Sequence, residues 1–115
     1  MDPREGYAMS MQAGKKIAEA VLAWPEVTQA PHRFGGIEFR CRGKEIGHLH
    51  GDALCDIPLT RPLRDEFVAA GMAEPHHIFP DSGWVSVYLR SDRDVAHAIE
   101  IMRRKHRDLM NQSNG

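Results

Sequence analysis

Hydrophobic residues recur at helical spacing in three stretches of the chain. In residues 13–24, four apolar residues fall at i, i+3, i+4 and i+7, which gives one apolar stripe along a helix that Pro25 ends. A second helix begins at the N-cap residue Thr60 and ends at Gly71, because glycine favours the C-terminal end of a helix. A third helix begins at Ser91 and carries an apolar stripe along its length.

Between the first two helices, apolar and polar residues alternate as they do in half-buried strands. Ile37, Phe39 and Cys41 face one way, and the charged residues between them face the other. Gly43 and Gly51 provide tight turns between neighbouring strands. The predicted strands are residues 27–33, 37–42, 44–50, 54–59, 74–79 and 84–90, the last two forming a hairpin around a turn at 80–83.

This order of elements predicts an α+β domain with one helix, three or four strands, a helix, two strands and a final helix. Short turns join most strands, so we expect a mainly antiparallel sheet in a two-layer fold, with the helices on one face. We expect residues 13–110 to form this single domain, residues 1–12 a flexible segment, and residues 111–115 a disordered tail. The expected core comprises Trp24, Ile37, Phe39, Ile57, Phe67, Val87, Leu89, Ile99 and Met102.

Composition and charge narrow the range of function classes. The 115 residues are 42% hydrophobic and 27% charged, as in ordinary globular proteins. Fifteen basic and sixteen acidic residues give a net charge of −1, which argues against a dedicated nucleic-acid-binding domain but is compatible with a local basic patch. The sequence shows no membrane-spanning run and no secretory signal, so we expect a cytoplasmic protein with Cys41 and Cys55 as reduced core thiols. The sequence does not indicate an oligomeric state.

The first segment that can carry chemistry is Glu45–Asp52. His48 and His50 are two residues apart on a predicted strand, so both side chains point to the same face of the sheet. Two histidines in this arrangement can bind a metal ion, but a site needs one or two further ligands, for which Asp52 in the next turn is a candidate. The alternative is a polar sheet face with hydrogen-bonded histidines and no ligand.

The second segment is His76–Trp84. Adjacent residues on a strand point to opposite faces, so we expect only one of His76 and His77 to join the first pair of histidines. Asp81 and Ser82 lie in a Pro-Asp-Ser-Gly turn, which they can hold through bonds to the backbone. In a functional site, Asp81 would bind a metal or orient a histidine, and Ser82 would donate a hydrogen bond.

Together the two segments lead to three hypotheses. The first is a polar pocket that binds a small, anionic or phosphate-bearing ligand, with a catalytic role left open, because imidazoles and the amides of the Gly51 and Ser82-Gly83 turns can bind an anion. The second is a non-catalytic nucleic-acid or protein interaction module that uses the sheet and the basic residues 103–107, and the third is a metal-binding domain. No motif identifies a cofactor. The candidate catalytic residues are His48, His50, His77 and Asp81, and the candidate ligand-binding residues are Asp52, His76, Ser82 and Trp84.

Four runs resemble a known family: residues 33–39, 45–52, 56–58 and 76–84. With their motifs G-H-x-H-G-D and H-H-x-x-P-D-S-G-W, they are similar to small bacterial proteins of the luciferase family, over about residues 24–109. The resemblance implies no particular reaction, and the sequence contains no recognisable flavin- or nucleotide-binding motif.

A weaker resemblance is to the YjbR/MmcQ-like proteins. It rests on the order of the elements and on the run Gly83-Trp84-Val85, which opens the last strand. Because that family has been suggested to bind DNA, the resemblance implies an interaction module. The histidine segments are not part of that family's pattern.

Overall fold

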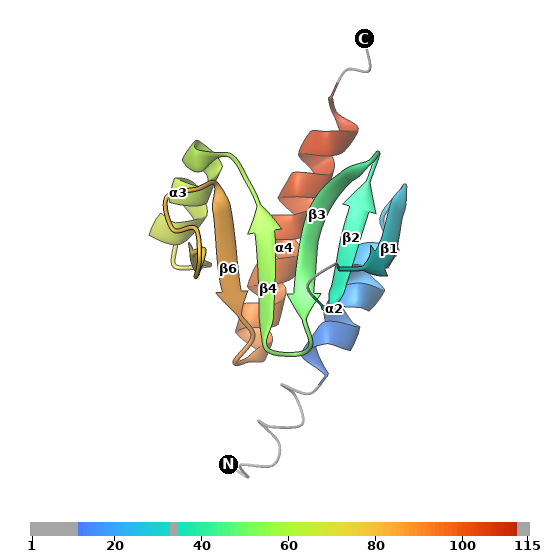
Figure 1. The fold of residues 1–115 in the computed structure, drawn as a ribbon, viewed down its shortest axis with the longest axis horizontal. Helices are drawn as coiled ribbons and strands as arrows, with labels where there is room; N and C mark the ends of the chain where they lie inside the picture. Colours follow the sequence, from blue (N-terminus) through green and yellow to red (C-terminus); the bar gives the residue numbers. More distant parts are fainter. Residues whose placement is uncertain (1–11, 33–34, 113–115) are drawn as a thin grey trace.

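The computed structural model describes residues 12–32 and 35–112, so residues 1–11 and 113–115 of the two expected end segments lie outside the described residues. The helices are α2 (Ala13–Leu22), α3 (Arg61–Ala69) and α4 (Asp92–Met110). The strands are β1 (Val27–Pro31), β2 (Ile37–Cys41), β3 (Lys44–His50), β4 (Leu54–Pro58), β5 (Glu74–Pro75) and β6 (Trp84–Tyr88). Figure 1 shows how these elements are arranged.

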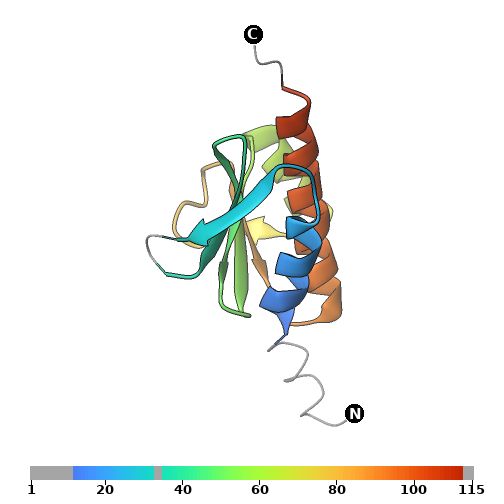
Figure 2. The ribbon, with the colours of Figure 1, turned by 90° about the vertical axis from the view of Figure 1, so that its right-hand side faces the viewer.

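The strands form one six-stranded sheet in the order β1-β2-β3-β4-β6-β5, and every neighbouring pair is antiparallel. Figure 2 shows the sheet nearly edge-on, with α2 and α4 packed against one of its faces. This arrangement confirms the predicted α+β class with an antiparallel sheet. Strands β4 and β6 are neighbours although α3 and β5 separate them in the sequence, so two distant segments lie side by side in the sheet.

The hydrophobic core lies between the sheet and the helices. Most of the predicted core is buried, and Trp24 and Ile99 pack against its margin. The prediction for Ile37 is wrong, because this side chain is 38% exposed. It lines a surface cavity with Gly14 and Ala18, and these small residues of α2 leave the start of β2 partly uncovered. The predicted core residues that are buried are Phe39, Ile57, Phe67, Val87, Leu89 and Met102.

Side-chain caps fix where α3 and α4 begin, as the sequence predicts. The Oγ atom of Thr60 accepts a hydrogen bond from the backbone N–H of Leu63 at 3.3 Å. The Oγ atom of Ser91 accepts one from the backbone N–H of Asp94, also at 3.3 Å. None of the described helices is both long enough and apolar enough to cross a membrane.

Buried cysteines and one glycine lie where the sheet meets the helices. Cys41 and Cys55 are both buried and free, in agreement with the expected core thiols. A Cβ atom at Gly47 would lie only 2.7 Å from the sulfur of Met102 and 3.1 Å from the carbonyl oxygen of Asp56. Glycine therefore lets α4 pack closely behind β3 and β4.

The last hairpin differs from its prediction, because β5 comprises only Glu74 and Pro75 and residues 76–83 form a loop. The backbone N–H groups of Ile78 and Phe79 donate to ring atom Nδ1 of His76, at 3.2 and 3.1 Å, instead of joining the sheet. Strand alternation therefore ends at Pro75 and does not govern the two histidines that follow it.

Candidate metal centre

The candidate site is built around Asp56, at the middle of β4. Its neighbours Cys55 and Ile57 are buried in the core, so strand alternation turns Asp56 to the opposite face of the sheet. Asp56 pairs directly with His48 of β3 on one side and with Ser86 of β6 on the other. The register of three neighbouring strands thus places these side chains in one row across the sheet.

Four histidines converge on one oxygen atom of Asp56, and the carboxylate is fully buried beneath them. His48 and His50 reach it from β3, two residues apart. His76 and His77 reach it from the loop after β5. The distances from Oδ2 of Asp56 to the Nε2 atoms are 3.0 Å for His50, 3.1 Å for His77, 3.3 Å for His48 and 3.5 Å for His76.

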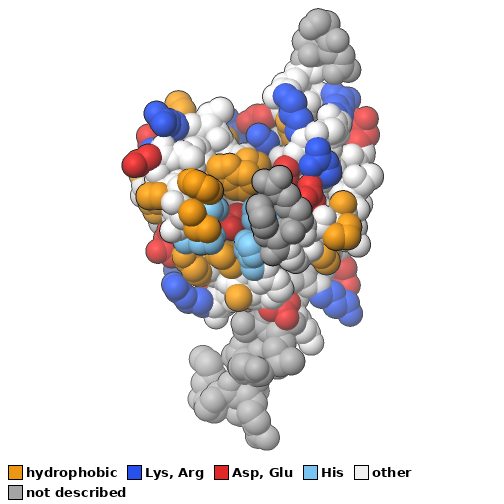
Figure 3. All heavy atoms as spheres, viewed as in Figure 1, with side chains coloured by type: hydrophobic (Ala, Val, Ile, Leu, Met, Phe, Trp, Pro, Cys, Tyr) orange, Lys and Arg blue, Asp and Glu red, His pale blue; other side chains and the backbone are white. Residues whose placement is uncertain are grey.

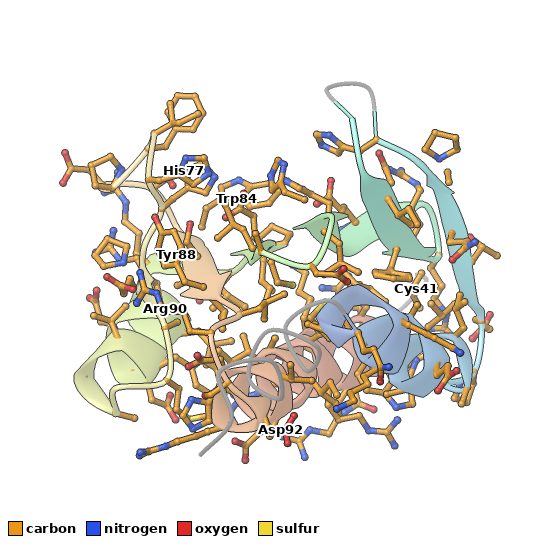
Figure 4. The ribbon with its side chains drawn as sticks, turned by 90° about the horizontal axis from the view of Figure 1, so that it is seen from below. Cys41, His77, Trp84, Tyr88, Arg90 and Asp92 are labelled. Carbon is orange, nitrogen blue, oxygen red and sulfur yellow. The ribbon has the colours of Figure 1, made fainter. Side chains whose placement is uncertain are left out.

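The expectation that only one of His76 and His77 joins the cluster is wrong. Both residues follow the end of β5, so the alternation that would separate adjacent side chains does not apply. Their rings stack with their centroids 4.4 Å apart. Figure 4 shows His77 close to Trp84 on the face of the sheet that points away from α2 and α4.

Further hydrogen bonds orient the members of the cluster. The Oγ atom of Ser86 donates to the other carboxylate oxygen of Asp56 at 2.7 Å. Ring atom Nδ1 of His48 lies 2.8 Å from a carboxylate oxygen of Glu45. The ring of His32 stacks on that of His48 with centroids 4.0 Å apart. These contacts hold the central carboxylate and the His48 ring in fixed orientations.

The electrostatics of the cluster favour a negative Asp56 and a positive His48 in the protein alone. For Asp56, burial raises the pKa, but hydrogen bonds from His48, Ser86 and His77 outweigh burial and hold the pKa well below its usual range. For His48, burial lowers the pKa, but hydrogen bonds to Asp56 and Glu45 outweigh burial and raise it to about 9. The pKa of His76 is lowered, mainly by burial.

The cluster forms the floor of an open cavity of about 710 Å³. In the space-filling view of Figure 3, histidine side chains gather in a hollow of the sheet face, with acidic atoms between them and hydrophobic side chains around them. Trp84 lines this cavity. The centroid of its ring lies 5.5 Å from the ring centroid of His48 and 5.8 Å from that of His76. At the rim, Ile78 is 64% exposed and Phe79 is 61% exposed.

Three other predicted site residues lie away from the cavity lining. Asp52 accepts a hydrogen bond from the backbone N–H of Gly14 at 2.8 Å, at the start of α2. Asp81 is exposed in the turn before β6. The Oγ atom of Ser82 donates to the carbonyl of Phe79 at 2.7 Å and accepts from the N–H of Trp84 at 3.2 Å. The structure thus shows Asp52 at a helix start and Ser82 holding its own turn.

Sequence reasoning missed Asp56, the residue at the centre of the cluster. One signal was available, because a charged residue inside the apolar strand Leu54–Pro58 must be buried or paired. Ser86, between two valines of β6, carries the same signal more weakly. Glu45 was included only as the first residue of the first histidine segment.

The family model of the luciferase domain matches residues 43–105, which is more than half of the chain. The chain belongs to the luciferase domain family. The matched segment of this luciferase domain contains Asp56 and all four histidines around it. No curated protein and no solved structure gives a significant match.

Proposed function

We propose that this luciferase domain binds one divalent first-row transition-metal ion through Nε2 of His48, His50 and His77 and the carboxylate of Asp56. The observation that carries the proposal is the convergence of these ring nitrogens on a single carboxylate oxygen. Imidazole and carboxylate groups together suit ions such as zinc, cobalt or iron. The third hypothesis from the sequence, a metal-binding domain, is therefore the one that the geometry supports best.

The spacing of the ligand atoms suits a shared ion. Two ligand atoms that are each about 2.1 Å from a metal ion lie about 3.0 Å apart at a right angle and about 3.4 Å apart at the tetrahedral angle. The distances from Oδ2 of Asp56 to the Nε2 atoms of His50, His77 and His48 are 3.0, 3.1 and 3.3 Å. The ligand atoms of His48, His50 and Asp56 also lie within 4.8 Å of one another, so these three can close around an ion, and the His77 ring would move toward them to complete the site.

A purely hydrogen-bonded cluster accounts less well for the arrangement. An ionised carboxylate offers about four lone-pair sites, about two on each oxygen. Four Nε2 atoms lie within 3.5 Å of Oδ2 of Asp56, which is more than this oxygen can accept as good hydrogen bonds. An ion between the carboxylate and the rings gives the surplus nitrogens a partner.

The contacts of Nδ1 decide which histidines can be ligands. In His48, Nδ1 faces the Glu45 carboxylate at 2.8 Å, so it keeps its proton when Nε2 releases its own proton and offers that lone pair to a metal. In His76, Nδ1 accepts hydrogen bonds from two backbone N–H groups, so it carries no proton. The proton of a neutral His76 must then be on Nε2, which makes that atom a hydrogen-bond donor to Asp56.

Because Nε2 of His76 holds a proton and Nε2 of His48 can bind a metal, the site favours one ion instead of two. Asp56, His76 and His77 form a second set of neighbouring ligand atoms beside His48, His50 and Asp56. Once Nε2 of His76 holds a proton, the second set retains only two ligands. His77 is then available to complete the first set, and the 3.5 Å distance of His76 is the longest of the four.

The proposed centre retains the first hypothesis in a modified form. If the ion is five- or six-coordinate, four protein ligands leave at least one coordination position open. The ion would lie at the floor of the open cavity. A small molecule with an oxygen donor can occupy that position, where the ion would polarise it as a Lewis acid. His48, His50 and His77 act in this proposal as metal ligands.

The interaction-module hypothesis finds less support. Two of the four basic residues late in α4 already have partners within the chain. The guanidinium of Arg103 lies 5.0 Å from the ring centre of Trp24, and Arg104 forms an ion pair with Asp108 at 3.2 Å. These contacts favour a solvated helix face that also stabilises the fold.

The test is the metal content of protein that was expressed and purified without a histidine tag. We expect one equivalent of metal as purified, or one equivalent after titration with zinc or cobalt. His50→Ala and Asp56→Ala should both lose it. His97→Ala is the matched control, because His97 lies on α4, away from the cavity lining. Absence of stoichiometric binding of zinc, cobalt, nickel, manganese and ferrous iron would overturn the proposal.

A further inference from the structure

The rim of the cavity differs chemically from its floor. Ile78 and Phe79 project from the loop after β5 and are the two most exposed of the large hydrophobic residues among those described. Both line the cavity, together with Trp84 and Pro31. Large exposed apolar side chains grouped at a cavity mark a binding surface more often than isolated ones do. The part of a ligand that lies above the floor therefore meets an apolar surface.

The fixed charges around the cavity limit the charge of a ligand. Arg40 is the one arginine or lysine among the lining residues that the structure describes. Its guanidinium already binds the carboxylate of Glu38 at 2.7 Å and the carbonyl of Gly43 at 2.6 Å. Glu45 adds a further carboxylate to the lining. A ligand with several negative charges, such as a phosphate ester, would meet more repulsion than attraction outside the metal ion.

The turn amides that the sequence suggested for anion binding do not reach the cavity. The N–H of Ser82 donates to the carbonyl of Phe79 at 3.1 Å. Neither Gly51 nor Gly83 is among the lining residues. The reason for expecting a phosphate group is thereby removed, and the ion and the histidines are left as the anion-binding elements.

We infer that the ligand of this site is a monocarboxylate with a flat apolar body, its carboxylate on the ion and its body against Phe79, Ile78 and Trp84. The inference rests on the proposed metal centre. One negative charge matches the single net positive charge of a divalent ion bound to Asp56. The cavity of about 710 Å³ lies within the range of about 300–1,000 Å³ that is usual for small-molecule sites.

The experiment uses the full chain loaded with cobalt(II), whose visible absorption changes when a new oxygen ligand binds. The probes are acetate, benzoate, 2-naphthoate and inorganic phosphate. We expect benzoate to bind about tenfold or more tightly than acetate, because burial of its ring adds a hydrophobic contribution. Naphthoate should bind at least as tightly as benzoate, and phosphate no more tightly than acetate.

Two variants locate the apolar contact. Ile78→Ala and Phe79→Ala should each weaken benzoate binding severalfold while leaving the affinities for cobalt and acetate unchanged. Leu22→Ala, which removes a 39%-exposed apolar side chain from α2 outside the cavity lining, is the matched control and should change none of these values. Equal affinities for acetate and benzoate in cobalt-loaded protein, or tighter binding of phosphate, would overturn the inference alone. Failure to bind any ion would overturn the metal centre and the inference with it.

Discussion

Replacing Asp56 by asparagine in the metal-free protein keeps the shape of this buried side chain and removes its charge. In the native protein that charge faces Nε2 of His48 at 3.3 Å. Together with Glu45, it raises the pKa of His48 to about 9, despite the opposing effect of burial. The variant should therefore be less stable, and the loss should depend on pH in a way that follows from His48.

The size of the effect follows from the pKa values. Relative to the ordinary value of 6.5, a folded-state pKa of about 9 contributes about 3–4 kcal/mol, at about 1.4 kcal/mol per pH unit. Because the folded-state pKa is raised, this contribution is fully present below about pH 6.5 and is lost as pH rises through about 9. In the variant, Glu45 still stabilises the charged form of His48, so part of this contribution remains. Asp56→Asn should therefore lower the free energy of unfolding by about 2 kcal/mol more near pH 6 than near pH 9.5.

Urea unfolding in the presence of EDTA, at both pH values, measures the free energy of unfolding of each protein. Asp81→Asn is the control, since Asp81 is exposed in a turn and its substitution should change stability by less than about 0.5 kcal/mol. If Asp56→Asn lowers stability equally at the two pH values, or raises it near pH 6, the charge coupling between Asp56 and His48 is refuted.

Three further predictions concern the ligands and the core. Glu45→Gln should weaken zinc binding about 10- to 100-fold in a competition assay while leaving the fold intact, because Glu45 orients His48; unchanged affinity would contradict that role. His76→Gln should retain one equivalent of zinc by elemental analysis, whereas His77→Gln should lower the affinity strongly; the reverse result would show that His76 is the ligand. Phe67→Ala should cost about 3–5 kcal/mol in urea unfolding, because Phe67 is buried in the core; an unchanged midpoint would show that α3 is not packed as described.

The fold was largely predictable because its signals are local. Caps at Thr60 and Ser91 mark where two helices begin, and alternation in β2 and β4 assigns each side chain to a face. The prediction of a strand beyond Pro75 was wrong because the side chain of His76 competes with the sheet for backbone N–H groups. Nδ1 of His76 accepts the N–H groups that strand pairing would need, and alternation does not show such a bond.

The site was only half predictable, because its centre depends on strand order. Spacing alone places His48 and His50 on one face. The pairing of β4 between β3 and β6 puts Asp56 opposite both His48 and Ser86, and that order is not readable from the sequence. The turn residues make contacts that the sequence does not reveal. Polar groups such as Asp52 and Ser82 satisfy nearby backbone atoms, which a motif alone does not distinguish from binding a ligand.

The most direct test of the central claim is a crystal structure of the zinc-loaded protein, with anomalous scattering at the zinc edge. The account predicts one zinc ion about 2.0–2.2 Å from Nε2 of His48, His50 and His77 and from a carboxylate oxygen of Asp56. It also predicts that Nδ1 of His76 still accepts its two backbone hydrogen bonds. A crystal with no zinc peak at Asp56, or a zinc ion bound to Nε2 of His76, would contradict the account.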